Sequence, residues 1–294
     1  MTQSLKDHIA RLLSATTTPV YKPVGGGCIN QTWQVTVGSD KFFCKINSAS
    51  RYPGLFDKEA AGLKALSDTG CIRCPSVISV SQLNDEQVLL MEWIETGSRH
   101  HEIWVQFGKQ LASLHTWKHP VHPETRFGFD HNNYMGSLPQ SNTFTSDWPT
   151  FFMEHRLQPQ VEMAHSQGLL NAAHLATFDN IYKKLPEIFS PTAASLLHGD
   201  LWSGNFLYGP DSQPVLIDPA VYYGHPAMDI AMTLLFGGFH ETFYEVYEYW
   251  APAAEDDYPD DVDLCSLYPL LIHLNLFGKG YLSDIESRLR RFRQ

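Results

Sequence analysis

The sequence predicts an α+β protein with two lobes, a small N-terminal lobe built on an antiparallel sheet and a larger, mainly helical C-terminal lobe. Two observations carry this prediction. Up to about residue 95, short runs with a period of two residues alternate with turns; from about His100 onward, long segments with helical periodicity take over. The 294 residues are enough for two lobes, and 43% hydrophobic with 18% charged residues is typical of a globular chain. We therefore expect lobes at 1–95 and 96–294.

The first lobe is expected to begin with a helix, followed by strands and one further helix in the order βββαββ. Apolar residues in MTQSLKDHIARLL recur at helical spacing, which favours an amphipathic helix over a signal peptide. Gly25–Gly27 are expected to close the first hairpin and Gly38–Asp40 the second. One helix is expected to begin at Pro53 and to end at Gly70. The expected strands cover residues 20–24, 31–37, 41–47, 76–83 and 87–93.

The second lobe is expected to be helical, with a short return of strand signal between residues 195 and 217. Three brief apolar runs, 195–197, 206–208 and 215–217, are separated by loops, and the chain from Pro226 onward is helical again. The stretch 255–263 contains six carboxylates. It lacks the glycine and the terminal glutamate of a calcium loop, so we expect a solvated surface loop there.

Charge and cysteine content narrow the class of partner. With 21 basic and 32 acidic residues the formal charge is −11, and the basic residues form no stripe, which argues against a nucleic-acid partner. Five cysteines, an odd number, are too few for a disulfide scaffold. No segment is long and apolar enough to suggest a membrane span. We expect a cytoplasmic protein that acts on a small substrate.

Three polar residues within LLHGDLWSGNFLYGPDSQPVLIDPA carry the strongest chemical signal. Asp200 and Asn205 have the D-x-x-x-x-N spacing of a kinase catalytic loop, in which the aspartate accepts the proton of a hydroxyl and the asparagine holds magnesium. Asp218 ends the following apolar strand and is expected to supply a second metal ligand. Carboxylate and amide oxygens are the ligands that Mg²⁺ prefers, and phosphoryl transfer needs such a cation to neutralise the triphosphate.

The first lobe offers matching residues for a phosphate group. Lys45 lies on the third expected strand and Glu59 on the helix that follows, an arrangement in which a strand lysine contacts phosphates and a helix glutamate positions it. Gly25, Gly26 and Gly27 stand upstream, where backbone amides without bulky side chains can approach phosphates. A strand follows these glycines, which argues against a dinucleotide-binding fold.

The chain resembles the fructosamine kinase family (ketosamine 3-kinases), relatives of aminoglycoside and choline kinases with a protein-kinase-like fold. The resemblance covers nearly the whole chain. The matching segments are VGGGCINQTW, FCKIN, LFDKEAAGLKAL, LLMEWIE, FGFDHNNYMGSLPQSN, DWPTFFMEHRLQPQ, LLHGDLWSGN, LIDPAVYYGHPAMDIAMTLLFGGF and LNLFGKGY. The combination of HGDLWSGN with the FGF and GSLPQSN stretches separates this family from generic antibiotic kinases.

The resemblance implies roles for individual residues and the cofactors ATP and Mg²⁺. Asp200 would be the catalytic base, Asn205 and Asp218 the magnesium ligands, Lys45 and Glu59 an ion pair, and Trp202 a contact to the sugar. Asp229 is expected to brace the catalytic loop by accepting backbone hydrogen bonds. The adenine-binding linker would comprise Met91, Glu92, Trp93 and Ile94.

The implied reaction is ATP-dependent phosphorylation of the 3-hydroxyl of ketosamines, such as fructosamine or ribulosamine adducts of protein lysines, with a role in deglycation and repair. Two alternatives stay open: another small-molecule kinase, acting on an aminoglycoside, choline or a sugar, or a catalytically inactive nucleotide-binding module. We expect a monomer or weak homodimer. Cys28 lies in the glycine hairpin that is expected to face the phosphates. Our hypothesis is that its oxidation would obstruct ATP binding and make the activity redox-dependent.

Overall fold

The computed structural model divides the chain into two compact units. It describes residues 1–25, 29–120, 126–252 and 258–292. Unit 1 consists of Met1–Ile103 together with Gly204–Pro219, and unit 2 consists of Trp104–Ser203 together with Ala220–Gln294. The sequence placed the boundary near residue 95 and assigned everything after it to one lobe. In the structure, the first unit extends to Ile103 and also contains a short segment from the second half of the chain.

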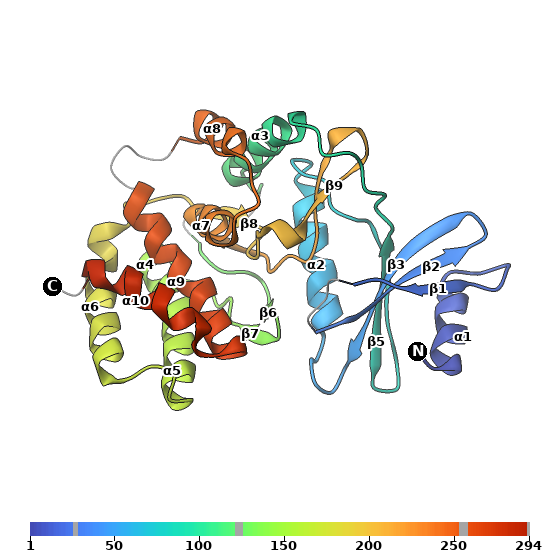
Figure 1. Cartoon of the computed structure of the whole chain (residues 1–294), viewed down its shortest axis with the longest axis horizontal. Coiled ribbons are helices and arrows are strands. Elements are labelled where there is room, and N and C mark those ends of the chain that lie inside the picture. The colour runs from blue at the N-terminus through green and yellow to red at the C-terminus, as the bar shows by residue number, and fades with distance from the viewer. Residues whose placement is uncertain (26–28, 121–125, 253–257, 293–294) are drawn as a thin grey trace. The chain divides into compact units, whose positions relative to one another are not determined.

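Unit 1 is built on a five-stranded antiparallel sheet with the strand order β1-β2-β3-β5-β4 (Figure 1). Two helices accompany it, α1 (Gln3–Leu12) and α2 (Leu55–Asp68). The predicted order βββαββ after the first helix is therefore confirmed. The strands are β1 (Val20–Pro23), β2 (Gln31–Val37), β3 (Asp40–Ser48), β4 (Val77–Leu83) and β5 (Glu86–Glu92).

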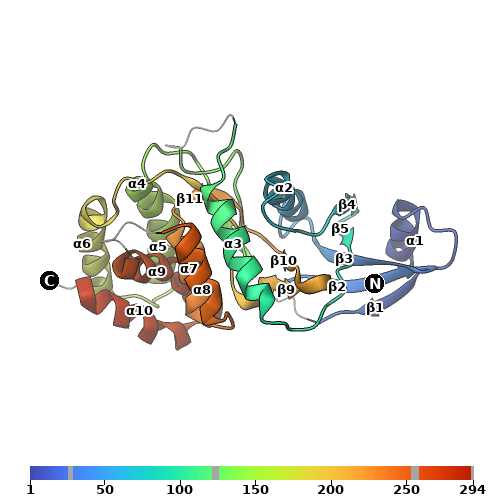
Figure 2. The ribbon, with the colours of Figure 1, turned by 90° about the horizontal axis from the view of Figure 1, so that it is seen from above.

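The two helices of unit 1 cover opposite faces of the sheet (Figure 2). Leu5 and Ile9 of α1 pack in one apolar cluster with Cys44 and Ile46 of β3. Because successive side chains of a strand point to opposite faces, Lys45 between these two residues points to the other face, toward α2. The alternation of β3 thus separates a small apolar core from the polar site described below.

The segment Gly204–Pro219 joins unit 1 through backbone hydrogen bonds. A 3₁₀ turn (Ser203–Asn205) leads into the antiparallel pair β9 (Phe206–Tyr208) and β10 (Pro214–Leu216). The Leu216 N–H donates to the Arg73 carbonyl at 3.0 Å, and the Gly97 N–H donates to the Tyr208 carbonyl at 2.6 Å. Gly97 lies so close to this hairpin that a Cβ there would be 2.3 Å from the Gly209 carbonyl oxygen. Only glycine fits this contact.

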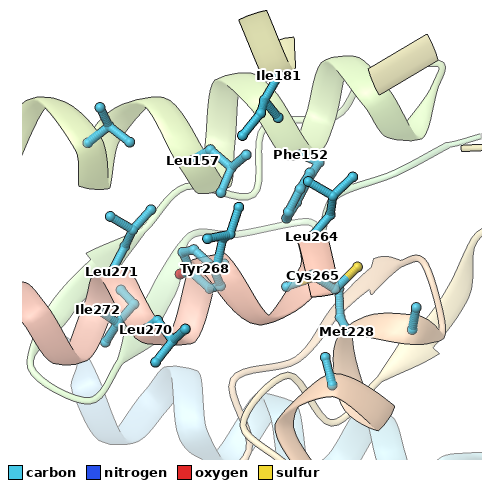
Figure 3. Close-up of a cluster of buried hydrophobic side chains, with 14 of the residues drawn as sticks. Phe152, Leu157, Ile181, Met228, Leu264, Cys265, Tyr268, Leu270, Leu271 and Ile272 are labelled. Carbon is cyan, nitrogen blue, oxygen red and sulfur yellow. The ribbon is translucent and has the colours of Figure 1, made fainter. Parts of the chain in front are cut away.

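Unit 2 is mainly helical and packs around α9 (Tyr258–Phe277). Side chains of α9 such as Tyr268 and Leu271 form one apolar core with Phe152, Leu157 and Met228 (Figure 3). The other helices are α3 (Glu102–Thr116), α4 (Trp148–Phe152), α5 (Gln158–Ser166), α6 (Ala172–Ile188), α7 (Ala227–Phe236), α8 (Glu241–Trp250) and α10 (Leu282–Leu289), with a π-helical turn at Met153–Leu157 between α4 and α5.

Two short antiparallel pairs in unit 2 contain strands that the sequence did not predict. The first pair joins β6 (Asn133–Met135) and β7 (Leu138–Gln140). The second joins the predicted strand β8 (Ser195–Leu197) to β11 (Tyr222–Gly224). Each new strand is three residues long, like the predicted strand β8, but the sequences NYM, LPQ and YYG contain Asn, Pro, Gln or Gly in place of an apolar run.

A buried polar network fixes the loop that follows β7. The Arg156 side chain is buried, donates to the Ser141 carbonyl at 2.6 Å and to Asn142 Oδ1 at 2.8 Å, and lies 3.9 Å from the centre of the Tyr222 ring. Asn142 in turn donates to Asn133 Oδ1 at 3.0 Å. Apart from Tyr222, these residues come from the FGFDHNNYMGSLPQSN and DWPTFFMEHRLQPQ segments, so part of that signature maintains the interior of unit 2.

The prediction of a solvated loop over 255–263 is wrong for its second half. Helix α9 begins at Tyr258, and Asp261 is buried, with its Oδ2 3.7 Å from His225 Nε2. Burial lowers the pKa of His225 to about 4, so the imidazole is neutral at physiological pH. Residues 253–257 lie outside the described part of the chain.

Hydropathy along the helices gives no membrane-spanning candidate. Within the described residues, every helix is too short or too polar to cross a bilayer.

Candidate active site

A buried lysine and two carboxylates form the polar centre of unit 1. Lys45 Nζ lies 2.7 Å from Glu59 Oε1 and 2.5 Å from Asp218 Oδ1. The side chains of Lys45 and Glu59 are 2% and 10% exposed, whereas that of Asp218 is 40% exposed. Strand β3, helix α2 and the end of β10 each supply one of these groups. The structure therefore brings together three residues that are up to 173 positions apart in the sequence.

Burial and charge act in opposite directions on this triad. Burial by itself lowers the pKa of Lys45, but the carboxylates of Asp218 and Glu59 outweigh burial and raise it above its ordinary value. Burial raises the pKa of Glu59, because the loss of hydration exceeds the attraction of Lys45. The lysine is therefore a permanent cation. Its more exposed partner, Asp218, is the carboxylate that solvent or a ligand can reach.

Asn205 and Asp218 come to the same end of one hairpin. Phe206 pairs with Leu216, so the residues flanking this pair, Asn205 and Ile217, are neighbours, and the Ile217 N–H donates to the Asn205 carbonyl at 3.1 Å. Asp218 has a φ of 57° in the left-handed region, which is unusual for a residue other than glycine. Such backbone strain clusters at functional sites.

The donor set at this hairpin end suits Mg²⁺. Among the described residues there is no group of three or more His, Cys, Asp or Glu side chains placed to hold a metal. Mg²⁺ needs no such cage in nucleotide-dependent enzymes, because it is held by one or two protein oxygens together with phosphate oxygens. The exposed carboxylate of Asp218 and the amide of Asn205 have the oxygen chemistry that such a site requires.

The glycine hairpin and the expected adenine linker also lie in unit 1. Gly25 lines a surface pocket with Asn30 and Thr32, while Gly26, Gly27 and Cys28 lie outside the described residues. The expected linker begins inside β5, which ends at Glu92.

The expected linker alternates in exposure: Met91 and Ile94 lie in the interior, whereas Glu92 and Trp93 are partly exposed and line a surface pocket. Met91 and Ile94 are buried, the Trp93 and Phe43 ring centres are 6.2 Å apart, and the Glu92 carboxylate accepts a 2.7 Å bond from Arg73.

In unit 2, a buried aspartate holds the loop that carries Asp200. Asp229 of α7 accepts the His198 N–H at 2.8 Å through Oδ2 and the Gly199 N–H at 2.9 Å through Oδ1. This is the bracing role that the resemblance implied for Asp229. Gly199 has a φ of 81°, and a Cβ there would lie 2.2 Å from the Ala220 carbonyl oxygen. The HGD sequence thus needs glycine at its centre for the turn that presents Asp200.

His115 is a residue of this network to which the sequence analysis gave no role. His115 is buried, its Nε2 donates to Asp229 Oδ2 at 3.2 Å, and its Nδ1 lies 2.8 Å from the Tyr247 hydroxyl. Burial alone would raise the pKa of Asp229, but the hydrogen bond and charge of His115 and the bond from Gly199 hold it below its ordinary value. The sequence does contain a pattern that could have indicated this role. His115 follows Leu111 by one helical turn on a buried helix face, where a polar side chain needs a partner.

The candidate residues divide between the two units. Lys45, Glu59, Asn205 and Asp218 belong to unit 1, and Asp200 belongs to unit 2. Trp202, also in unit 2, has a largely accessible side chain that is 39% exposed.

The arrangement of an antiparallel sheet unit, a helical unit and this set of polar residues defines a kinase-like class. Solved structures agree. One aminoglycoside phosphotransferase superposes with a TM-score of 0.66 at 12% identity, covering 97% of this chain and 98% of that one, which shows the fold alone. A candidate fructosamine-3-kinase from Thermobifida fusca superposes with a TM-score of 0.86 at 29% identity, covering 99% of this chain and 98% of that one.

Sequence relatives narrow the class to a family. The family model described as fructosamine kinase matches residues 1–294. A probable ketoamine kinase of Synechocystis sp. is 38% identical over 96% of this chain and 95% of its own length. A chloroplastic protein-ribulosamine 3-kinase of Arabidopsis thaliana is 38% identical over 90% of this chain and 79% of its own length. The chain belongs to the fructosamine kinase family.

We predict that Lys45→Met weakens nucleotide binding about 10–100-fold, because a charge-assisted hydrogen bond is worth roughly 1.5–3 kcal/mol. Calorimetric titration of the purified protein with ATP and Mg²⁺ measures this change. Lys41→Met is the matched control, since Lys41 lies on the same strand and pairs with Glu95 at the exposed surface. Equal affinities of Lys45→Met and the wild type would contradict the prediction.

We predict that Asp229→Asn lowers kcat about 10–100-fold while the affinity for ATP is kept. The amide has only one oxygen for the backbone N–H groups of His198 and Gly199, so the loop carrying Asp200 loses charge-assisted bonds. Initial-rate kinetics and ATP titration of the same preparation separate the two effects. Asp179→Asn, at an exposed position of α6, provides a control with the same chemical change. A kcat equal to that of the control would refute the bracing role.

Proposed function

We propose that this protein is an ATP- and Mg²⁺-dependent kinase that phosphorylates the 3-hydroxyl of ketosamines, including ribulosamine and fructosamine adducts of protein lysines, and thereby serves protein deglycation. Membership of the fructosamine kinase family is the observation that carries the proposal. The names of the relatives support the same substrate class, since they include ketoamine kinases and protein-ribulosamine 3-kinases. The buried lysine with two carboxylates supports the nucleotide side of the reaction.

In the proposed reaction, the sugar 3-hydroxyl attacks the γ-phosphorus of ATP. A new bond forms between the 3-oxygen and phosphorus, the bond to the β,γ-bridging oxygen breaks, and ADP leaves with that electron pair. Asp200 accepts the proton of the hydroxyl, which its placement on a braced loop allows. Trp202, two residues further on and 39% exposed, would contact the sugar.

Unit 1 would hold the triphosphate. Lys45 supplies a permanent positive charge for phosphate oxygens, and Glu59 fixes its direction from α2. Asn205 and Asp218 would hold Mg²⁺, which when bound neutralises charge on the phosphates. Gly25, Gly26 and Gly27 would offer backbone N–H groups to the phosphates, and the linker Met91–Ile94 would receive the adenine.

We also propose a cytoplasmic location and a monomeric or weakly dimeric state. The four cysteines within the described residues, Cys44, Cys71, Cys74 and Cys265, are free thiols, which supports a reducing compartment.

A substrate panel tests the proposed function. ATP consumption is measured with a ribulosamine, a fructosamine, choline and an aminoglycoside, each with and without Mg²⁺. We expect consumption with the ketosamines only, and loss of it when a chelator removes Mg²⁺. Consumption with choline or the aminoglycoside alone would replace the proposal by one of the alternative kinases, and consumption with none would favour an inactive nucleotide-binding module.

We predict that Asp200→Ala abolishes measurable turnover, a decrease of roughly 10²–10⁴-fold for the loss of a general base. ATP binding should survive, because Asp200 belongs to unit 2 and the nucleotide residues belong to unit 1. Rates and ATP titrations of wild type and variant check both parts. Turnover by Asp200→Ala at the rate of wild type would remove Asp200 from the role of base.

A further inference from the structure

A row of aromatic side chains leads from Trp202 across the surface of unit 2. The ring centres of Trp202 and Phe236 are 6.4 Å apart, those of Phe236 and His273 are 4.7 Å apart, and those of His273 and Phe277 are 5.5 Å apart. Tyr281 closes the row at 5.1 Å from His273. We call Trp202, Phe236, His273, Phe277 and Tyr281 the aromatic row.

The aromatic row is accessible along most of its length. Trp202, Phe236 and Phe277 are 39%, 36% and 57% exposed, and they are among the most exposed large apolar side chains of the described residues. Leu234, two residues before Phe236 on α7, is half exposed as well. Single exposed apolar residues are common, but a connected set that begins two residues after the proposed base Asp200 indicates a binding surface.

Local backbone geometry fixes the two ends of the row. Phe236 ends α7, and Gly238, with a φ of 94°, packs so closely on Ser203 that a Cβ would lie 2.6 Å from the Ser203 Cβ. This contact sets the position of Phe236 relative to the loop carrying Trp202. Gly278, with a φ of 87°, ends α9 and turns the chain so that Tyr281 returns to His273. The motifs LLFGGF and LNLFGKGY thus build the row.

His273 adds a polar atom within the row. Its Nδ1 lies 2.7 Å from the Pro269 carbonyl oxygen, which can only accept, so Nδ1 carries the hydrogen. Burial lowers the pKa of this imidazole, so the ring is neutral and its Nε2 is a hydrogen-bond acceptor. The row therefore combines aromatic faces, which attract cations, with one acceptor for an N–H group.

We propose that the aromatic row is a subsite for the amine half of the substrate and that its occupant is the side chain of a lysine bearing the ketose. This inference rests on the proposed function. With the sugar at Trp202, the secondary ammonium that joins sugar to lysine lies at the start of the row, where aromatic faces stabilise a cation. The four methylenes of the lysine then lie along Phe236 and Phe277, as lysine stems do on apolar surfaces.

The test compares two ketosamines with the same ketose, one formed on methylamine and one on the side chain of Nα-acetyl-lysine amide. Both carry the ammonium, and only the second carries the lysine stem. We expect wild type to prefer the lysine adduct in kcat/KM, and Phe277→Ala to reduce that preference about fivefold, mainly through KM, as expected for one lost aromatic contact.

Two further variants control this comparison. Phe277→Tyr keeps the ring and should keep the preference of the wild type. Tyr249→Ala removes an aromatic side chain that is 80% exposed on α8, outside the row, and should leave the ratio unchanged. An equal ratio in wild type and Phe277→Ala, or a wild-type preference for the methylamine adduct, would overturn the subsite.

A second measurement separates this inference from the proposed function. Saturation-transfer NMR detects binding of Nα-acetyl-lysine amide itself, without sugar or ATP. We expect transfer to its side-chain methylenes with the wild type and its loss with Phe277→Ala. If the wild type phosphorylates neither ketosamine but this transfer is seen, the proposed function fails and the subsite stands. If both are phosphorylated without any dependence on Phe277, the subsite fails and the proposed function stands.

Discussion

The loop of unit 2 that carries Asp200 depends on one buried carboxylate. Asp229 has no access to water, yet it stays ionised because the His198 and Gly199 N–H groups and His115 Nε2 all donate to it. A carboxylate in the interior is stable only when its oxygens are satisfied in this way. The same bonds that stabilise the charge also hold the backbone next to Asp200. The hydrogen bonds that keep the interior of unit 2 stable therefore also hold the proposed base in position.

Unit 1 also contains a buried charge, of the opposite sign, that its neighbours must stabilise. Lys45 is a buried cation shared by Glu59 from the adjacent helix and Asp218 from the distant hairpin. The two carboxylates differ in accessibility, so their roles can differ. The buried Glu59 holds the lysine in place, and the more exposed Asp218 can also bind another cation. A lysine shared by two carboxylates has no net positive charge, so on a chain with a net charge of −11 the proposed Mg²⁺ and backbone N–H groups would have to supply the rest of the compensation for a polyanion.

Much of this arrangement could be predicted from sequence, because it depends on local pattern. The strand alternation around Lys45, the helix carrying Glu59 and the composite HGDLWSGN spacing all act over short distances. His115 was missed, since its partner Asp229 lies 114 residues away. The three-residue strands β6, β7 and β11 are stabilised by their pairing partners and by buried side chains such as Arg156, which no periodicity reveals. The assignment of 204–219 to unit 1 likewise depends on contacts with Arg73 and Gly97.

The membership of Gly204–Pro219 in unit 1 makes that unit discontinuous, and the polypeptide passes between the units three times. A fragment comprising only Met1–Ile103 would leave the Arg73 carbonyl and the Gly97 N–H without the partners that Leu216 and Tyr208 provide. It would also retain Lys45 and Glu59 but lose Asp218. An autonomous version of this unit therefore requires a fusion that links Ile103 to Gly204, whereas simple truncation removes an integral part of its fold.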